Sequence, residues 1–231
     1  MTVTISPIVQ RADFCSITLV GNLVHEPKIR YQANPVLAIA DITIATHSRW
    51  FDKLSNSYKE WTTYHDVKVV GDIVEQNLLY AQKGEVILIQ GHLSHQKNTE
   101  KELLLATFVQ LFARGYSQEI NQLQCSGQLL IPFRLITTEN NKVFAEASIS
   151  IVQQLLTTNK QQKHAVQIQR PIHIWGKQAQ YLAEKAQVGD GLIIEGKLGY
   201  LNKVPKKQLI EAKQVLLTKY KEQQVTENTP N

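Results

Sequence analysis

Short segments of the chain alternate apolar and polar residues with a period of two, which is typical of β-strands. In residues 72–82 the apolar positions instead follow a helical spacing, and Gly84 comes just after them, as glycine does past a helix end. Further strand-like segments follow this helix. The predicted strands of the first half occupy residues 16–23, 37–46, 64–70, 85–90 and 103–112.

The second half of the chain repeats this order of elements. Three glycines of the first half are separated by 13 and 7 residues, and three glycines of the second half have the same spacings at an offset of 105. The match predicts a helix at residues 178–187 and strands at residues 192–196 and 208–217. We therefore predict a duplicated domain of about 100 residues. The glycines are Gly71, Gly84 and Gly91, and then Gly176, Gly189 and Gly196.

Five strands with one helix between the third and the fourth is the element order of an OB-fold, a small, partly open barrel. The sequence thus predicts an all-β chain of two tandem OB-folds, at residues 13–116 and 122–220. We expect residues 1–12 to form a flexible arm, residues 116–123 a short polar linker and residues 221–231 a disordered tail. In the strands, the repeated glycines would allow bends at barrel corners or close approach of two backbones.

Composition narrows the function classes. With 43% hydrophobic residues the chain can bury ordinary cores, and no apolar run approaches the roughly 18 residues that a membrane helix needs. The 25 basic and 20 acidic side chains leave a formal charge of +5. Residues 1–116 hold 11 of each sign, so the whole excess lies in the second half. This mild asymmetry is a weak indication of a polyanionic partner.

The sequence lacks the signatures of enzymes and metal sites. Cys15 and Cys125 form neither a disulfide framework nor a Cys-x-x-Cys pair, so we expect free thiols in a cytoplasmic protein. His92 and His95 would point to opposite faces of a strand, which argues against a metal site. No phosphate-binding loop, nucleophile elbow or carboxylate pair occurs. We therefore expect no catalytic activity, no cofactor and no metal.

The segment from residue 50 to residue 64 joins the second and third predicted strands and is rich in rings. A hairpin loop has no core to fill, so aromatic residues among basic and small polar residues indicate another role. Each ring could stack on an unpaired base, worth about 1–3 kcal/mol, while the cations contact phosphate. Packing of Tyr64 and Trp61 on the barrel as ordinary strand residues is the alternative. The candidate stacking residues are Trp50, Phe51, Tyr58, Trp61 and Tyr64.

Basic residues form a second group of candidates. They lie near this hairpin, after the first strand and in two hairpins of the second domain, so loops at one rim of a barrel could form an electrostatic groove. The alternative for any single lysine is a solvated surface residue. The candidate phosphate contacts are Lys28, Arg30, Arg49, Lys53, Lys59, Lys160, Lys163, Lys203, Lys206 and Lys207.

Several short motifs of the first domain occur together and in order. VGNL stands at residues 20–23, IAT at residues 44–46 and YHDV at residues 64–67. In this combination they resemble the bacterial single-stranded DNA-binding protein family. The resemblance covers about residues 14–113 and extends more faintly over residues 122–218.

The resemblance implies which rings would stack on bases. Trp50 and Tyr64 match aromatic positions of the family, whereas two further aromatic positions fall on Val70 and near Asn98. The second domain places Trp175 where the first has Val70, so Trp175 joins the candidate stacking residues. Because its own hairpin is basic and polar, the second domain would supply charge where the first supplies rings.

The resemblance also implies an assembly. It places His65 at an interface between subunits, and because the family commonly assembles four OB-folds, it implies a homodimer of this two-domain chain. The housekeeping members of the family end in an acidic tail that recruits replication and repair proteins. In this chain, residues 227–231 contain no acidic cluster. We therefore expect an accessory role in replication, recombination, repair or the maintenance of plasmids and mobile elements.

The predicted function is to bind single-stranded DNA with little sequence preference, in the cytoplasm and associated with the nucleoid. Two alternatives remain open. The thin aromatic set is compatible with a protein-interaction module of a primosome-like replication or recombination complex. RNA binding is the other alternative, because OB-folds bind both polymers and the sequence shows no reader of the 2′-hydroxyl.

Overall fold

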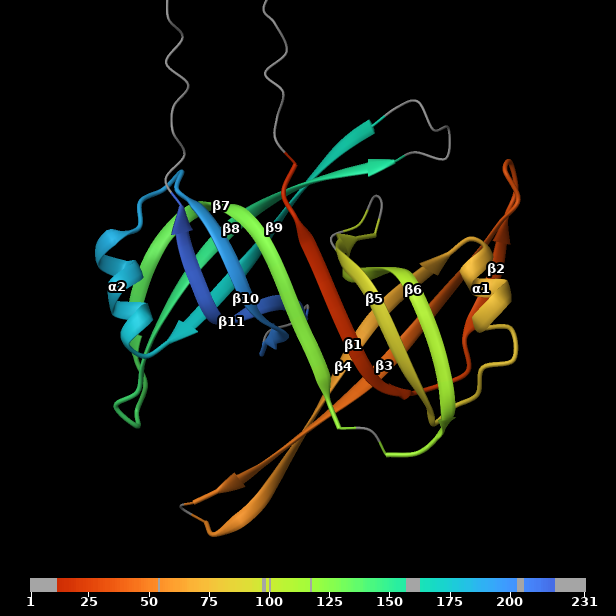
Figure 1. Cartoon of the computed structure of the whole chain (residues 1–231), viewed down its shortest axis with the longest axis horizontal. Helices are drawn as coiled ribbons and strands as arrows, with labels where there is room; N and C mark the ends of the chain where they lie inside the picture. Colours follow the sequence, from red (N-terminus) through yellow and green to blue (C-terminus); the bar gives the residue numbers. More distant parts are fainter. Residues whose placement is uncertain are drawn as a thin grey trace, which may run out of the picture.

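The chain folds into two β-barrels with the same order of strands, and each has one helix packed against it (Figure 1). The computed structural model describes residues 12–53, 55–96, 99, 101–116, 118–156, 163–202 and 206–218. The first barrel contains β1 (Cys15–Leu23), β2 (Lys28–Gln32), β3 (Leu37–Asp52), β4 (Ser57–Val70), α1 (Asp72–Asn77), β5 (Glu85–His95) and β6 (Glu102–Arg114). The second contains β7 (Ile120–Thr137), β8 (Val143–Leu156), β9 (Lys163–Trp175), α2 (Lys177–Lys185), β10 (Gly191–Leu201) and β11 (Lys207–Thr218).

Hydrogen bonds between strands close each barrel. In the first, the order β1–β5–β6–β4–β3 returns to β1 where Asn22 and Leu23 pair with Ala45 and Ile44. In the second, the order β7–β8–β9–β11–β10 returns to β7. The last strand runs parallel to the third long strand in both barrels. This topology confirms the two predicted OB-folds, and the first barrel carries β2 as an additional short strand at the edge of β3.

Gly91 and Gly196 occupy equivalent places in the two barrels. The strand register shifts by a β-bulge immediately before each glycine. A Cβ atom at Gly91 would collide with the carbonyl oxygen of Leu105, and one at Gly196 would collide with that of Glu211. The close backbone approach predicted for these glycines is confirmed, because only a residue without a side chain fits there.

The region between residues 50 and 64 differs from its prediction as a loop. β3 runs on to Asp52 and β4 begins at Ser57, so most of this segment is an antiparallel ladder. The sequence pattern does not predict these two strands, because both faces of their ladder are open to solvent. No alternation of buried and exposed positions is then needed, and the period of two is lost.

Three smaller boundaries also differ. Lys28 and Arg30, expected in the loop after the first strand, lie in β2. α1 ends at Asn77 and not at residue 82, because the chain continues past the buried Leu78 as a turn that keeps the apolar spacing. β7 begins at Ile120, within the predicted linker, where polar residues face solvent on a strand.

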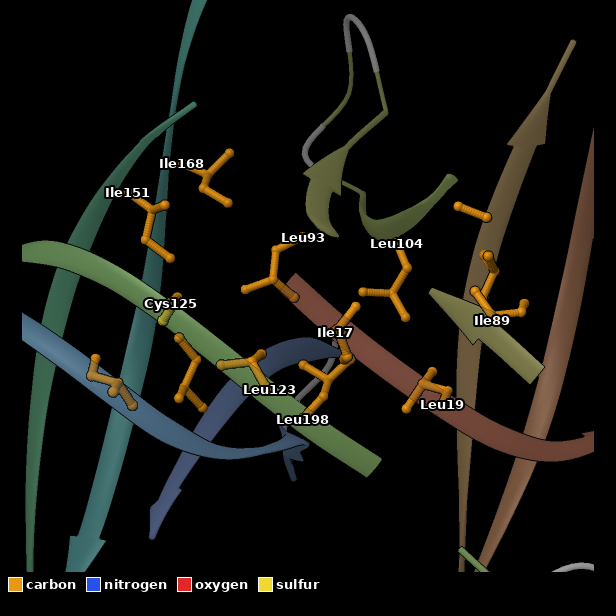
Figure 2. Close-up of a cluster of buried hydrophobic side chains, with 14 of the residues drawn as sticks. Ile17, Leu19, Ile89, Leu93, Leu104, Leu123, Cys125, Ile151, Ile168 and Leu198 are labelled. Atoms are coloured by element: carbon orange, nitrogen blue, oxygen red, sulfur yellow. The ribbon is translucent and has the colours of Figure 1, made fainter. Parts of the chain in front are cut away.

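β1 and β7 join the two barrels through an antiparallel ladder that runs from Cys15 opposite Cys125 to Val20 opposite Ile120. The side chains facing inward from this ladder belong to one continuous hydrophobic cluster. Figure 2 shows its members from both barrels meeting around β1 and β7. The two domains therefore share a core. The members labelled there are Ile17, Leu19, Ile89, Leu93, Leu104, Leu123, Cys125, Ile151, Ile168 and Leu198.

Candidate nucleic-acid interface

A two-stranded ribbon extends from the first barrel and carries five of the six candidate stacking residues. We call residues 45–53 and 55–64 the aromatic hairpin; they pair from Ala45 with Tyr64 to Asp52 with Ser57. In Figure 1 this ribbon, drawn in orange, projects away from both barrels. Beyond its buried base at Ala45 and Thr46, its side chains therefore stay accessible to a ligand on either face.

The register divides the rings of the aromatic hairpin between two faces. Residues directly opposite each other in an antiparallel pair share a face, and neighbours along a strand alternate. Trp50 opposes Lys59 and Ser48 opposes Trp61, so the two tryptophans lie on the same face. Their side chains are 46% and 66% exposed, which leaves both rings available for stacking. We call this face the tryptophan face.

The other three rings lie on the opposite face. Phe51 opposes Tyr58, and their rings meet edge to face with centroids 5.3 Å apart. The guanidinium carbon of Arg49 lies 4.4 Å from the centre of the Tyr58 ring. Tyr64, opposite Ala45, lies on this face nearer to the barrel. A DNA strand bound along one face of the ribbon would thus contact the rings of that face and not those of the other.

Several predicted phosphate contacts have acidic partners, and others do not. Because each of the paired cations is about half exposed, each pair adds little stability and a phosphate can compete for the cation. Lys28, Lys53 and Lys207 form no ion pair with any other described residue. The pairs are Arg30 with Asp41, Lys59 Nζ with Asp52 Oδ2 at 2.5 Å, and Arg49 Nε with Glu60 Oε1 at 3.6 Å.

Lys206 lies at the junction of the two barrels and not free in a loop. Its Nζ donates a hydrogen bond to the carbonyl oxygen of Tyr64 at 2.6 Å and lies 3.8 Å from the centre of the Tyr200 ring. Partial burial there lowers the pKa of Lys206. Lys206 thus connects the second barrel to the base of the aromatic hairpin. The predicted contacts outside the described residues are Lys160, Lys203 and the side chain of Lys163.

Trp175 lies on the second barrel, at the end of β9, where its side chain is half exposed. It opposes Phe144 with ring centroids 4.7 Å apart, and Phe144 lies 4.9 Å from the ring of His173. Sequence reasoning missed Phe144 and His173 as part of this group. The internal repeat could have indicated that Phe144 pairs with Trp175. At the offset of 105 these two residues correspond to Ile39 and Val70, which pair with each other in the first barrel.

His65 is fully buried between the two domains of one chain, whereas the resemblance placed it between subunits. Its Nε2 lies 3.1 Å from Thr46 Oγ1, and its Nδ1 lies 3.1 Å from the hydroxyl of Tyr200 in the second barrel. Burial, together with the nearby cation of Lys206, lowers the pKa of His65 to about 4. A neutral imidazole therefore holds this part of the domain interface.

The described residues form neither a metal site nor a membrane-spanning helix. No cluster of three or more His, Cys, Asp or Glu side chains is placed to hold a metal ion in this part of the chain. None of the helices there is long and apolar enough to cross a membrane.

OB-fold barrels that carry exposed rings and nearby cations define a class of proteins that bind unpaired nucleic acid. The single-strand binding protein family matches the chain at residues 14–113 and 120–221, which is most of its length. The chain belongs to this family and is a single-stranded DNA-binding protein.

Two solved structures that are similar over most of the chain agree with this fold. The wild-type single-stranded DNA-binding protein of Thermus aquaticus is similar over 95% of this chain and 100% of its own, with a TM-score of 0.72 and 22% identity. A deletion variant of the Thermus aquaticus protein is similar over 91% of this chain and 97% of its own, with a TM-score of 0.71 and 21% identity. The Plasmodium falciparum SSB in complex with ssDNA matches 44% of this chain and 96% of its own, at a TM-score of 0.36 and 25% identity.

Proposed function

We propose that this protein binds single-stranded DNA along the aromatic hairpin, by stacking of bases on its rings and by contacts of cations with phosphate. The observation that carries this proposal is the projection of five exposed rings on a ribbon that has no core to cover. Ring faces stack on any base, so little sequence preference is expected. Lys28 and Lys53 would contact phosphate directly, whereas Arg49 and Lys59 would exchange their carboxylate partners for it.

We further propose that the second barrel contributes Trp175 and positive charge to the same function. The proposed function needs no chemical step, no cofactor and no metal. Its setting would be the cytoplasm, at the nucleoid, in replication, recombination, repair or the maintenance of plasmids and mobile elements. The uneven distribution of charge between the halves of the chain supports a division of labour between the two barrels.

A titration tests the function. The protein is titrated with a dT oligomer, an RNA of equal length and duplex DNA at several salt concentrations, and the fluorescence of its tryptophans is followed. We expect quenching by dT, weaker binding to the duplex, and an affinity that falls as salt rises because counterions are released from the DNA. Tighter binding to the RNA would favour the RNA alternative. No binding at low salt would favour a protein-interaction module.

Replacing Trp50 with alanine tests the stacking itself. We expect Trp50→Ala to weaken binding of a fluorescently labelled dT oligomer by about 1–3 kcal/mol, measured by anisotropy, because one stacked base loses its platform. Tyr80→Ala is the matched control, since this ring is 86% exposed but lies outside the aromatic hairpin. Equal affinities of Trp50→Ala and the control would reduce Trp50 to a structural residue.

We also propose that two copies of the chain form a homodimer through one broad sheet face. The strands β11, β10, β7, β1, β5 and β6 pair in series, and Figure 1 shows most of them crossing the front of the molecule. Charged residues are sparse on their outward side, where the Glu195 carboxylate lies 3.8 Å from Lys213 Nζ. Exposed apolar residues among uncharged serine, threonine and glutamine side chains indicate an interface here, and a second copy offers a self-complementary one. The exposed apolar residues on it are Phe14, Phe108, Phe112, Ile120, Ile193 and Leu216.

A double substitution on this face tests the dimer. We expect the wild-type protein to have twice its chain mass of 26.2 kDa in solution, and Ile193→Glu with Leu216→Glu to have the mass of a single chain. The two residues are directly opposite each other, so the variant would place two charges in the interface. Val188→Glu, on an exposed residue of the α2–β10 connection, is the control. A single-chain mass for the wild type by light scattering would contradict the proposal.

A further inference from the structure

The connection between the barrels is attached to the base of the aromatic hairpin. Glu119, just before β7, accepts a hydrogen bond from Thr46 Oγ1 at 3.2 Å and a close one from Ser48 Oγ. Its backbone N–H donates to the carbonyl oxygen of His47 at 3.1 Å. Asn121 Nδ2 donates to the same carboxylate at 3.3 Å. In Figure 1 this connection passes beside the point where the ribbon leaves the barrel.

These contacts hold both faces of the ribbon. Thr46 and Ser48 lie on the tryptophan face, and Ser48 is directly opposite Trp61. His47 lies on the other face, where its ring stacks with Tyr116 at a centroid distance of 5.7 Å. The connection is therefore hydrogen-bonded to the ribbon next to Trp61, the tryptophan that lies nearer to the barrel.

The same hydrogen-bond network reaches into the second barrel. Thr46 Oγ1, which donates to Glu119, also lies 3.1 Å from His65 Nε2, and His65 Nδ1 lies 3.1 Å from the Tyr200 hydroxyl. Lys206, beside Tyr200, donates to the Tyr64 carbonyl oxygen. The base of the ribbon is thus fixed by groups that lie outside the first barrel.

We infer that Glu119 is a positioning residue for DNA binding: it orients the aromatic hairpin without touching the DNA. The inference rests on the proposed function of that hairpin. A two-stranded ribbon with solvent on both faces is only marginally stable by itself. Stacking needs rings at fixed places, so a ribbon that is held in advance loses less conformational entropy when DNA binds.

The sign of the effect separates positioning from electrostatics. A carboxylate near a surface that binds phosphate repels DNA, so its removal alone should strengthen binding. If Glu119 acts through position, its removal should weaken binding despite the loss of negative charge. Glu60, on the aromatic hairpin and 3.6 Å from Arg49, is the matched acidic residue for comparison.

The experiment compares the binding of labelled dT by wild type, Glu119→Ala, Glu119→Gln and Glu60→Ala. We expect Glu119→Ala to bind roughly five- to tenfold more weakly, because the ribbon loses hydrogen bonds to a charged group. Glu119→Gln, which keeps an acceptor oxygen and a polar side chain of the same shape, should restore affinity to within about twofold of wild type. Glu60→Ala should bind as tightly as wild type or more tightly. Hydrogen exchange of the ribbon amides should be faster in Glu119→Ala.

Ser48→Ala provides a second variant that leaves the charge unchanged, and we expect it to weaken binding about twofold to fivefold. Binding by Glu119→Ala that equals or exceeds that of wild type, in parallel with Glu60→Ala, would overturn the inference. That result would leave the proposed function standing. Failure of the wild-type protein itself to bind dT would remove the proposed function instead.

Discussion

Replacing Arg170 with alanine will lower the free energy of unfolding by about 3–5 kcal/mol, because the change leaves buried partners without a charge and without hydrogen bonds. Arg170 is 3% exposed. Its guanidinium donates to Gln208 Oε1 at 2.9 Å and to the Ser94 carbonyl oxygen at 2.7 Å, and lies 3.3 Å from Glu102 Oε1. Since Ser94 and Glu102 belong to the first barrel, the loss falls on the domain interface.

Chemical denaturation at neutral pH measures this loss. Arg134→Ala is the control, because Arg134 also pairs with a glutamate on a strand, Glu146, but is largely exposed. We expect the control to lose less than about 1 kcal/mol. Equal losses in the two variants would mean that the interface does not depend on the buried pair.

The fold could be predicted because the repeated glycines mark positions where the backbone leaves no room for a side chain. Gly91 and Gly196 are needed where two backbones approach each other, and such requirements are visible as spacings in one sequence. The alternating segments that face the barrel interior, such as residues 64–70 in β4, were equally clear. Both signals come from burial, which imposes a local pattern on the chain.

The joining of the barrels could not be predicted in the same way. Nothing local in β1 or β7 says that Cys15 will stand opposite Cys125, since any exposed strand edge can accept a partner. Arg170 is a further example, because a charged residue in a strand is usually exposed. Its burial depends on Glu102 and Ser94, which are distant in sequence and become neighbours only through that ladder.

The candidate site was predicted in its residue types but not in its geometry. The ring-rich segment was found by composition, whereas the separation of Trp50 and Trp61 from Tyr64 follows from a strand register that the sequence does not show. The sequence predicts only a short polar linker at residues 116–123. Glu119 matters only because the hairpin base lies beside it, and no motif marks such a contact.

Acidification should destabilise the protein through His65. The pKa of His65 falls from 6.5 to about 4 in the folded protein, chiefly by burial. Below about pH 6.5, His65 is protonated in the unfolded chain but stays neutral in the folded protein. The stability contributed by the neutral imidazole is therefore lost as pH falls towards 4. At 1.36 kcal/mol for each pKa unit, the loss from this one group is about 3 kcal/mol between pH 7.5 and pH 4.

His65→Gln isolates this contribution, because glutamine can hydrogen-bond to Thr46 and Tyr200 but does not titrate. The free energy of unfolding of both proteins is measured by urea denaturation at several pH values from 7.5 to 4. His92 and His173, whose pKa values are also lowered by burial, titrate in both proteins and cancel in the difference. We expect wild type to lose about 3 kcal/mol more than His65→Gln over this range. Parallel losses in the two proteins would show that His65 is already protonated in the folded state or is reached by water, and that the domain interface does not depend on its neutral form.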